Sequence, residues 1–440
     1  MTDARMNRRL ANLLSVRLGE ARLGEVRDDR DPRGKRWGLE VLLRATIVGI
    51  ASGAKSLAET EEVTASLSRA MRRKLGIARR VPDTTLRDNL CRVLPDLVVS
   101  SLHAVVRAAH RRKALEPDGL PFGVASFDGK GTAIPSSDDW YAQRQTQTDD
   151  GPLRGVVRTV TVTLTSSQAR PCIDVVAIPA HTNETGIFQA ALAHTLQAYG
   201  GKDLFRVITY DAGACSLANA AAVRAHHLHY VFGLTAAQPT LFEEARSWLG
   251  SRSADVADAI TRDHDHGNTV IRRIYMGPAT AAPEGWEHLR SVLRVETETL
   301  DSSGTRVRIE NRYVISSLAA DRLTPEQWML LIRRHWGVET THQALDVAFE
   351  EDDHPWIEQN PRGMLVVAIL RRIAYTLLAL FRGVTQRSDE RRAMPWKRLL
   401  RSIHRALLLT TDVSLPAYAF APRYLETIGD PGLTPTKTQP

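Results

Sequence analysis

The chain has 440 residues, with 58 Lys and Arg against 50 Asp and Glu, and so a formal net charge of +8. This length exceeds one ordinary core and predicts two or three domains, while the positive balance favours an anionic partner, with nucleic acid ahead of an acidic membrane surface. The three cysteines are scattered without a C-x-x-C pair, which argues against a disulfide framework and against a structural zinc cluster.

The apolar stretches of the sequence do not indicate a membrane span. The first residues, Met1 to Arg5, lack an apolar leader, and charges interrupt the two most apolar stretches at Arg44 and at Arg371-Arg372. We therefore expect a cytoplasmic protein that does not interact with a membrane.

Residues 1–118 are expected to be helical. Helix-like spacing of apolar residues covers Leu39–Ala51 and Ser56–Leu75, and Pro82 then interrupts the pattern. Six basic residues fall within twelve positions here: Arg69, Arg72, Arg73, Lys74, Arg79 and Arg80. They predict phosphate contacts along one face, and a solvated helix end is an equal alternative.

From about residue 121 the sequence changes to β-branched runs with a period of two. Val124–Asp128 predicts a short strand, Val156–Thr165 an antiparallel strand with one exposed face, and Cys172–Ile178 its neighbour. A helix over Thr185–Tyr199 and a buried strand over Leu204–Tyr210 follow.

Helices and strands then alternate up to a second β region and a helical tail. We expect a helix over Cys215–Ala225, a strand over His229–Leu234 and a helix over Thr240–Leu249. The inserted β region comprises strands at Val270–Met276, His288–Glu298 and Arg306–Ser316, with Arg272, Arg273, Arg290, Arg294, Arg306, Arg308 and Arg312. The tail comprises helices over Pro325–Phe349, Pro361–Phe381 and Pro395–Leu409.

Two acidic residues follow apolar strands. Asp128 stands in Ser-Phe-Asp-Gly-Lys and Asp211 in Thr-Tyr-Asp-Ala-Gly. A strand that ends in Asp-Gly is also an ordinary turn signal. Two such sites are more informative, because adjacent strands of one sheet would bring both carboxylates within reach of a shared cation. Magnesium prefers such oxygen ligands.

A third carboxylate would come from the helix predicted to begin at Pro325. His335, Glu339, His342 and Asp346 are separated by four, three and four residues, so they form one polar stripe on this helix. Helix phase alone allows any of them to join the two aspartates, and a solvent-facing stripe is the alternative.

The segment Ile332–Asp352 resembles the signature His-Trp-x-Ile-Glu-Asn-x-Leu-His-Trp-x-Leu-Asp-Val-x-Phe-x-Glu-Asp of the H-repeat-associated insertion-sequence transposases, a branch of the DDE group. Further motifs occur in the family's order: Asp31-Pro32-Arg33, Lys55-Ser56-Leu57, Phe127-Asp128-Gly129-Lys130, Thr182-Asn183-Glu184, Thr209-Tyr210-Asp211-Ala212, His266-Gly267 with Arg272-Arg273, and Leu370-Arg371-Arg372-Ile373-Ala374. Together they span nearly the whole chain.

The resemblance implies that Asp128, Asp211 and Glu339 bind two divalent ions, Mg²⁺ with Mn²⁺ as a substitute, and that Asp128 bridges them. It also implies DNA contacts near the scissile phosphate, which we expect from Lys130, Arg333, Arg334, His335 and His342. For Lys130 and the two histidines, a packed or solvated role is an equal alternative. We expect Arg272, Arg273, Arg72, Arg73 and Lys74 to contact DNA phosphates farther away.

Some positions depart from the family signature. Thr340 replaces its Asn, Thr341 and Gln343 flank its His, and Thr235-Ala236-Ala237-Gln238 replaces its Lys-x-Asn-Gln. The Tyr-x-x-Arg pattern of the wider group is absent, since Ile332 and His335 stand at those places. None of these changes removes a carboxylate of the triad.

The resemblance implies a mixed α/β fold with a ribonuclease H-like catalytic core. The expected parts are a helical DNA-binding domain (1–118), the first part of the core (119–265), the inserted β region (266–320), the helix with Glu339 and the C-terminal helices (321–412), and a loose tail (413–440).

The expected function is that of an insertion-sequence transposase that cuts element ends and joins them to target DNA. Its expected partners are double-stranded DNA, as terminal inverted repeats and target, and further copies of the chain in a dimer or higher multimer. Its expected location is the bacterial nucleoid. Two alternatives are a domesticated DNA-binding protein without strand transfer and a metal-dependent endonuclease that does not join.

Overall fold

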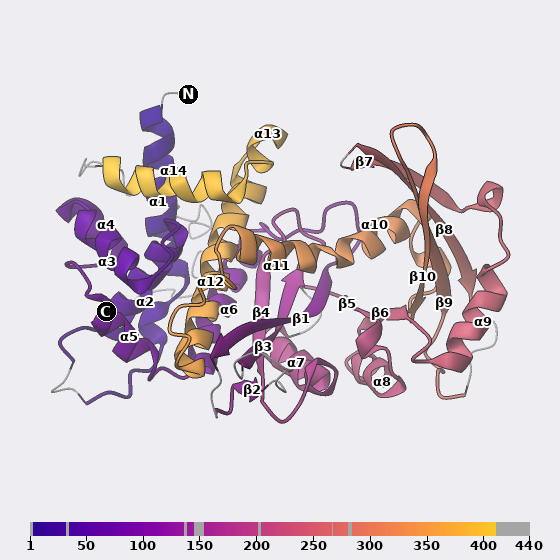
Figure 1. Cartoon of the computed structure of the whole chain (residues 1–440), viewed down its shortest axis with the longest axis horizontal. Coiled ribbons are helices and arrows are strands. Elements are labelled where there is room, and N and C mark those ends of the chain that lie inside the picture. The colour runs from indigo at the N-terminus through magenta and orange to yellow at the C-terminus, as the bar shows by residue number, and fades with distance from the viewer. Residues whose placement is uncertain are drawn as a thin grey trace, which may run out of the picture.

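The computed structural model describes residues 3–31, 35–135, 139–144, 154–200, 204–265, 267–279 and 284–410. One sheet runs through the molecule, with the N-terminal helices at one end and the strands β7 to β10 at the other (Figure 1). The expected mixed α/β fold, with helical N-terminal and C-terminal parts, is confirmed. The tail at 413–440 lies outside the described residues.

The N-terminal part is built from short helices. They are α1 (Asp3–Glu20), the 3₁₀ turn η1 (Leu23–Glu25), α2 (Leu39–Ala51), α3 (Leu57–Ser66), α4 (Arg69–Leu75), α5 (Asp83–Leu90) and α6 (Pro95–Arg111). The prediction of one helical run over Ser56–Leu75 is wrong, because Ser56 caps α3 and Ser68 caps α4. Each serine accepts a hydrogen bond from a first-turn amide, so a new helix begins after it.

The sheet has ten strands in the order β2-β3-β1-β5-β6-β10-β9-β8-β7, with β4 paired to β3. They are β1 (Val124–Pro135), β2 (Ala142–Arg144), β3 (Arg154–Leu164), β4 (Cys172–Ile178), β5 (Val207–Tyr210), β6 (His229–Leu234), β7 (Ala259–Asp265), β8 (Asn268–Pro278), β9 (Ser291–Leu300) and β10 (Arg306–Ser316). The strands β1, β5 and β6 run parallel to one another, and the other pairs are antiparallel.

The expected β region continues this sheet, because β10 pairs with β6. The strand β7 was not expected from the sequence. Its side chains are mostly exposed, so its sequence lacks the apolar alternation that marks a half-buried strand.

The prediction that β3 has one exposed face is wrong, because both of its faces are buried. Its polar face meets a buried ion pair between Arg372 and Glu351, whose nearest nitrogen and oxygen are 3.0 Å apart. The guanidinium of Arg372 also donates to the hydroxyls of Thr159 and Thr161. The threonines of β3, whose alternation in the sequence predicts a solvent-exposed face, therefore bind the buried guanidinium of Arg372.

The remaining helices cover the sheet and complete the core. They are α7 (Glu184–Tyr199), α8 (Leu217–Ala225), α9 (Pro239–Leu249), α10 (Pro325–His335), α11 (Gly337–Val347), α12 (Pro361–Leu380), α13 (Asp389–Arg392) and α14 (Trp396–Leu409). Short helical turns are η3 (Ala212–Ala214), η4 (Ala254–Val256), η5 (Ala320–Arg322) and η6 (Phe381–Thr385). The prediction of one helix over Pro325–Phe349 is wrong, since α10 and α11 are separated at Trp336.

The helix α12 lies at the centre of the protein and packs against α2, α6 and β4. The segment Pro361–Thr385 is long and apolar enough to cross a membrane, but its apolar stretch is entirely buried inside the protein. Its two arginines, Arg371 and Arg372, are buried there as well. These features are those of a core helix.

Candidate active site

Asp128 lies within β1, and Asp211 follows the last residue of the neighbouring parallel strand β5. The pairing of β1 with β5 places Ser126 opposite Thr209, and each aspartate follows two residues later. Asp211 ends β5 and caps η3, where its Oδ1 accepts a hydrogen bond of 3.0 Å from the amide of Gly213. The sheet therefore brings the two aspartates together. The prediction that the first strand ends at Asp128 is wrong, because β1 continues to Pro135 and Asp128 pairs with Thr161 of β3 within it.

Glu339 lies on the first turn of α11, which packs against β1 and β3. One turn later, Nδ1 of His342 lies 3.1 Å from Oδ2 of Asp128. Burial raises the pKa of Glu339, and the charge of Asp128 and, to a smaller extent, that of Asp211 raise it further, while Arg312 and His342 oppose this effect. The structure thus groups Glu339 with both aspartates.

The polar stripe predicted around Glu339 faces the sheet. His335, on α10, lies with Nδ1 3.0 Å from the hydroxyl of Thr209. Asp346 contacts Lys130, and His342 contacts Asp128. The solvent-facing alternative is therefore wrong for these residues, although the Glu339 side chain is exposed.

Buried hydroxyls support the ends of the strands that carry the aspartates. Thr209 donates to the hydroxyl of Ser126 over 2.7 Å, and that hydroxyl lies 2.7 Å from the hydroxyl of Thr165. Burial lowers the pKa of His335, which favours the neutral ring at this position. The chain from His335 to Thr165 thus connects α10, β5 and β1.

The composition of this site suits divalent cations. Among the described residues, no lysine or arginine forms an ion pair with Asp128, Asp211 or Glu339, that is, a contact of 4 Å or less between nitrogen and carboxylate oxygen. Oxygen-only donor sets of this kind suit Mg²⁺ and Mn²⁺. A bound cation would offset the mutual repulsion that raises the pKa of Glu339.

The three carboxylates form an open arrangement. Their possible ligand atoms do not all lie within 4.8 Å of one another. Among the described residues, such a close group is formed instead by His103, Asp174 and His194. The open spacing of the three carboxylates would suit a pair of divalent ions, which Asp128, Asp211 and Glu339 would hold together.

A fourth carboxylate, Glu184, lies beside the two aspartates. It is the first residue of α7, and its Oε1 accepts hydrogen bonds from the amide of Gly129, at 3.1 Å, and from the hydroxyl of Tyr210, at 2.9 Å. Burial raises the pKa of Glu184, and the charges of Asp211 and Asp128 add to this effect. The sequence marks this segment only through the motif Thr182-Asn183-Glu184, which by itself gives Glu184 no role in the site.

Lys130 does not face solvent in this structure. Its side chain is 6% exposed, and its ammonium group donates to Asp346, over 2.5 Å, and to Asp352, over 3.0 Å. Asp352 also accepts from the hydroxyl of Thr132. A phosphate contact by Lys130 stays a prediction, and it would require the ammonium group to leave both carboxylates.

Two of the expected arginines, Arg272 and Arg333, meet near the site. Both bind Oδ2 of Asp263, at 2.6 Å and 3.1 Å. The guanidinium of Arg312 lies 4.7 Å from the ring centre of Trp336, between α10 and α11, and lowers the pKa of Glu339. Burial lowers the pKa of Arg272, and repulsion from Arg333 and Arg312 contributes. The three guanidinium groups thus lie close to one another, together with the carboxylates of Asp263 and Asp265.

The other two arginines near this region are engaged within the protein. Arg273 binds Glu296 and Glu298 on β9. Arg334 is buried and donates to backbone carbonyl groups and to the carboxylate of Asp118. Their phosphate contacts stay predictions, and each would have to give up these bonds.

The basic residues of α4 lie far from the aspartates, at the end of the molecule formed by the N-terminal helices (Figure 1). Arg72 donates to the backbone carbonyls of Leu67 and Ala65, Arg73 is exposed, and burial lowers the pKa of Lys74. Contacts from α4 to DNA stay a prediction, and they would fall on a separate stretch of the duplex.

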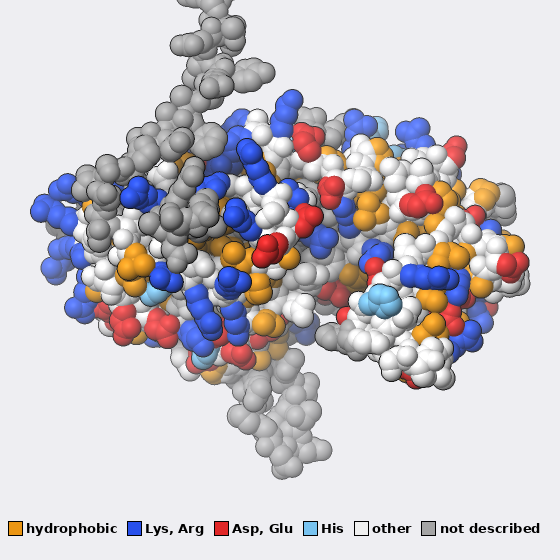
Figure 2. All heavy atoms as spheres, turned by 90° about the horizontal axis from the view of Figure 1, so that it is seen from above, with side chains coloured by type: hydrophobic (Ala, Val, Ile, Leu, Met, Phe, Trp, Pro, Cys, Tyr) orange, Lys and Arg blue, Asp and Glu red, His pale blue; other side chains and the backbone are white. Residues whose placement is uncertain are grey.

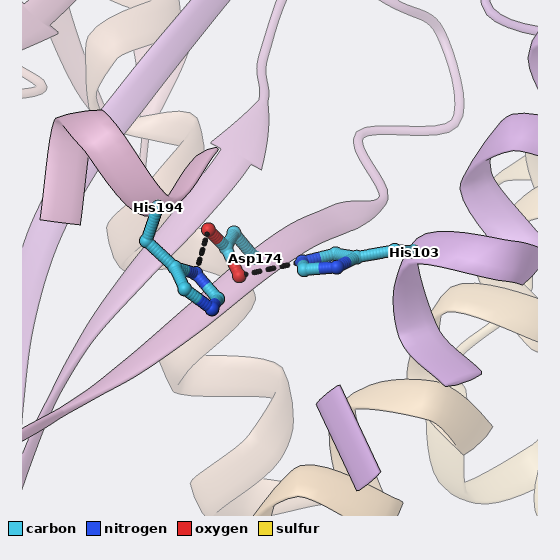
Figure 3. Close-up of side chains that lie close together, drawn as sticks. All are labelled: His103, Asp174 and His194. Atoms are coloured by element: carbon cyan, nitrogen blue, oxygen red, sulfur yellow. Dashed lines mark hydrogen bonds and ion pairs between the residues drawn. The ribbon is translucent and has the colours of Figure 1, made fainter. Parts of the chain in front are cut away.

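The group of His103, Asp174 and His194 connects α6, β4 and α7 (Figure 3). Asp174 lies between the two rings, with Oδ1 2.8 Å from His103 Nε2 and Oδ2 2.9 Å from His194 Nδ1. Asp174 also accepts from Thr195 and from the amide of Val175. These bonds satisfy the buried carboxylate without a metal ion, so we interpret the group as a structural link.

Residues 122–377 match a protein-family model described as "Transposase DDE domain". The matched segment contains Asp128, Asp211 and Glu339 together with Glu184. A comparison with curated proteins gives no match.

Proposed function

This chain belongs to the transposase DDE domain family, and on that premise we propose that it is an insertion-sequence transposase. It would cut the ends of its element and join them to target DNA. Its core is ribonuclease H-like, as expected for this family. We further propose that it belongs to the H-repeat-associated group, on the strength of the motif at Ile332–Asp352.

One observation carries the proposal. The carboxylates of Asp128 in β1 and of Asp211 after β5 both act electrostatically on Glu339 of α11, and among the described residues none of the three forms an ion pair with lysine or arginine. Such an arrangement concentrates negative charge where β1, the end of β5 and α11 meet. Divalent ions, Mg²⁺ or Mn²⁺, are the partners that would neutralise it.

When bound, a pair of such ions activates a water molecule or a 3′-hydroxyl and stabilises the oxygen that leaves phosphorus. The residues of the chain would hold and orient this centre. His342 fixes Oδ2 of Asp128, and the amide of Gly213 fixes Oδ1 of Asp211, so within the described part of the chain the second oxygen of Asp211 stays available as a ligand. No protein nucleophile is required.

The same end of the sheet offers contacts to DNA. Arg312 lies beside Glu339, and Arg272 and Arg333 lie near Arg312, where phosphates next to the scissile bond would pass. We propose double-stranded DNA as the partner, both as terminal repeats and as target, bound by a dimer or higher multimer in the bacterial nucleoid.

A joining assay tests this function. Purified full-length protein would be incubated with Mg²⁺, DNA carrying the element end, and a target plasmid, and the products would be sequenced. We expect end fragments covalently joined to the plasmid. Cleaved ends without joined products would identify an endonuclease, and binding without cleavage would identify a domesticated DNA-binding protein. Either result would contradict the proposed function.

A further inference from the structure

We propose that Glu184 is a fourth carboxylate of the metal site, which provides an oxygen donor to the divalent ions at Asp128 and Asp211. This inference rests on the proposed function, because it assigns a residue to the same centre. It adds a donor from α7, an element that the triad does not include.

Hydrogen bonds hold Glu184 between the two aspartates. The amide that donates to its Oε1 belongs to Gly129, the residue after Asp128. The hydroxyl that donates to the same oxygen belongs to Tyr210, the residue before Asp211. Both donors use Oε1, so the carboxylate is fixed in orientation while Oε2 remains able to accept from another partner.

Glycine at position 129 makes room for this carboxylate. A Cβ atom at position 129 would overlap Oε2 of Glu184, far inside van der Waals distance. Any other residue would therefore push the carboxylate away from the strand. The close approach of Glu184 to β1 depends on the absence of a side chain immediately after Asp128.

Glu184 lies near the two aspartates on the face of the sheet opposite to α11. The ring of Phe127 packs against Phe188 of α7, whereas Asp128, the next residue of β1, contacts His342 of α11. Successive side chains of a strand point to opposite faces, so α7 and α11 enclose the sheet from two sides. Glu184 and Glu339 then approach the two aspartates from opposite faces of the sheet, where β5 ends beside β1.

The charge around Glu184 favours a cation. The side chain is about half-buried, and both aspartates act on it electrostatically. Among the described residues no lysine or arginine forms an ion pair with it. A cavity of about 290 Å³, lined in part by Gly129, Glu184 and the two basic residues Lys130 and Arg158, opens beside the carboxylate. A hydrated ion therefore has room to reach Glu184.

The test measures Mn²⁺ binding to the full-length protein without DNA, from the electron paramagnetic resonance signal of free Mn²⁺. We expect Glu184→Gln to weaken Mn²⁺ binding about tenfold or more, since partners of metal ligands typically contribute 10- to 100-fold in affinity. The matched control is Glu326→Gln, which removes an exposed first-turn glutamate from α10 and should leave the affinity unchanged.

Wild-type affinity in Glu184→Gln would overturn the inference. Asp128→Asn distinguishes a failure of this inference from a failure of the proposed function. If Asp128→Asn loses Mn²⁺ binding while Glu184→Gln retains it, the proposed function stands and the role of Glu184 fails. If Asp128→Asn also binds as the wild type does, the proposed metal centre itself fails.

A second variant keeps the test decisive if Glu184→Gln does not fold. Tyr210→Phe removes one of the two donors that orient Oε1 and leaves all four carboxylates in place. Mn²⁺ binding weakened by about tenfold in Tyr210→Phe would support the inference. Unchanged binding in this folded variant would overturn it.

Discussion

Nδ1 of His342 lies 3.1 Å from Oδ2 of Asp128, so α11 is tied directly to the strand β1 that it covers. Glu339 precedes His342 by three residues on the same helix, and the two side chains therefore share one face. The contact joins α11 to Asp128, so Glu339 lies on the same side of the strand as that carboxylate. It converts two elements far apart in sequence into one site.

We therefore expect His342→Ala to slow Mg²⁺-dependent cleavage of element ends by about 10- to 100-fold, because the carboxylate of Asp128 loses its orienting partner. DNA binding measured by fluorescence anisotropy should change little. Gln343→Ala, an exposed change on the same helix, is the control and should cleave normally. Normal cleavage by His342→Ala would show that the contact has no positioning role.

The triad variants should be more severely affected. Asp128→Asn, Asp211→Asn and Glu339→Gln each remove one negative charge from the proposed metal centre, and we expect cleavage to fall more than about 100-fold. DNA affinity should remain near that of the wild type. The control is Asp353→Asn, an exposed change after α11. Gel analysis of labelled ends measures both, and substantial cleavage by any triad variant removes that residue from the centre.

A second DNA-binding surface is predicted on α14. Its apolar residues Leu399, Leu400, Ile403 and Leu407 are buried, whereas Arg398, Arg401 and Arg405 are exposed on the opposite side. Figure 2 views the molecule from this side and shows many Lys and Arg side chains around it. Replacing all three by Gln should weaken DNA binding. The slope of the logarithm of the binding constant against the logarithm of the salt concentration should become shallower by about one for each arginine that no longer binds a phosphate.

Titration of DNA at several salt concentrations measures this slope. Arg246→Gln on α9, at the other end of the molecule, is the control for loss of an exposed arginine. An unchanged slope in the α14 variant would show that this face does not touch DNA. Equal loss in the control would indicate a general effect of charge.

The link between His103, Asp174 and His194 should make stability depend on pH. Burial would raise the pKa of Asp174, but hydrogen bonds from His103 and His194 and their charges outweigh it and lower the pKa. The bond to Asp174 raises the pKa of His194. A raised histidine pKa gives stability that is complete below the ordinary value of about 6.5 and is lost as the pH rises through the folded-state value.

We therefore expect the melting temperature of the wild type to fall between about pH 6.5 and the raised pKa of His194. The depressed pKa of Asp174 adds a second loss, confined to strongly acidic pH. Asp174→Asn should lower the free energy of unfolding by about 1–3 kcal/mol at about pH 6. It should also reduce the fall of the melting temperature with rising pH above about pH 6.5. His226→Asn, at an exposed histidine, should retain the slope. A slope unchanged in Asp174→Asn would contradict the prediction.

The placement of the two aspartates could be anticipated because it depends on local pattern. An apolar run ending in Asp predicts a carboxylate at a strand end, which is correct for Asp211 but wrong for Asp128, since β1 continues to Pro135. Parallel pairing of β1 with β5 still brings Asp128 and Asp211 side by side. Glu339 is different. Its position was expected from the family resemblance, since the helix phase equally allowed His335, His342 or Asp346 to serve as the third group.

Features that depend on long-range packing were not visible in the sequence. Glu184 reaches the site only because α7 starts beside Gly129 in the folded chain. The burial of β3 depends on Arg372, more than two hundred residues later in the sequence, which satisfies its threonines. No pattern in the neighbouring sequence marks either of these contacts.

The pairing of β10 with β6 limits how the protein can be shortened. Removal of residues 259–316 would leave the amides and carbonyls of β6, from Val231 to Leu234, without their partners on β10. A bare edge of this kind is a template for strand addition from another molecule. We expect such a truncated chain to aggregate instead of forming a minimal nuclease, so a smaller version would need a replacement strand to close this edge.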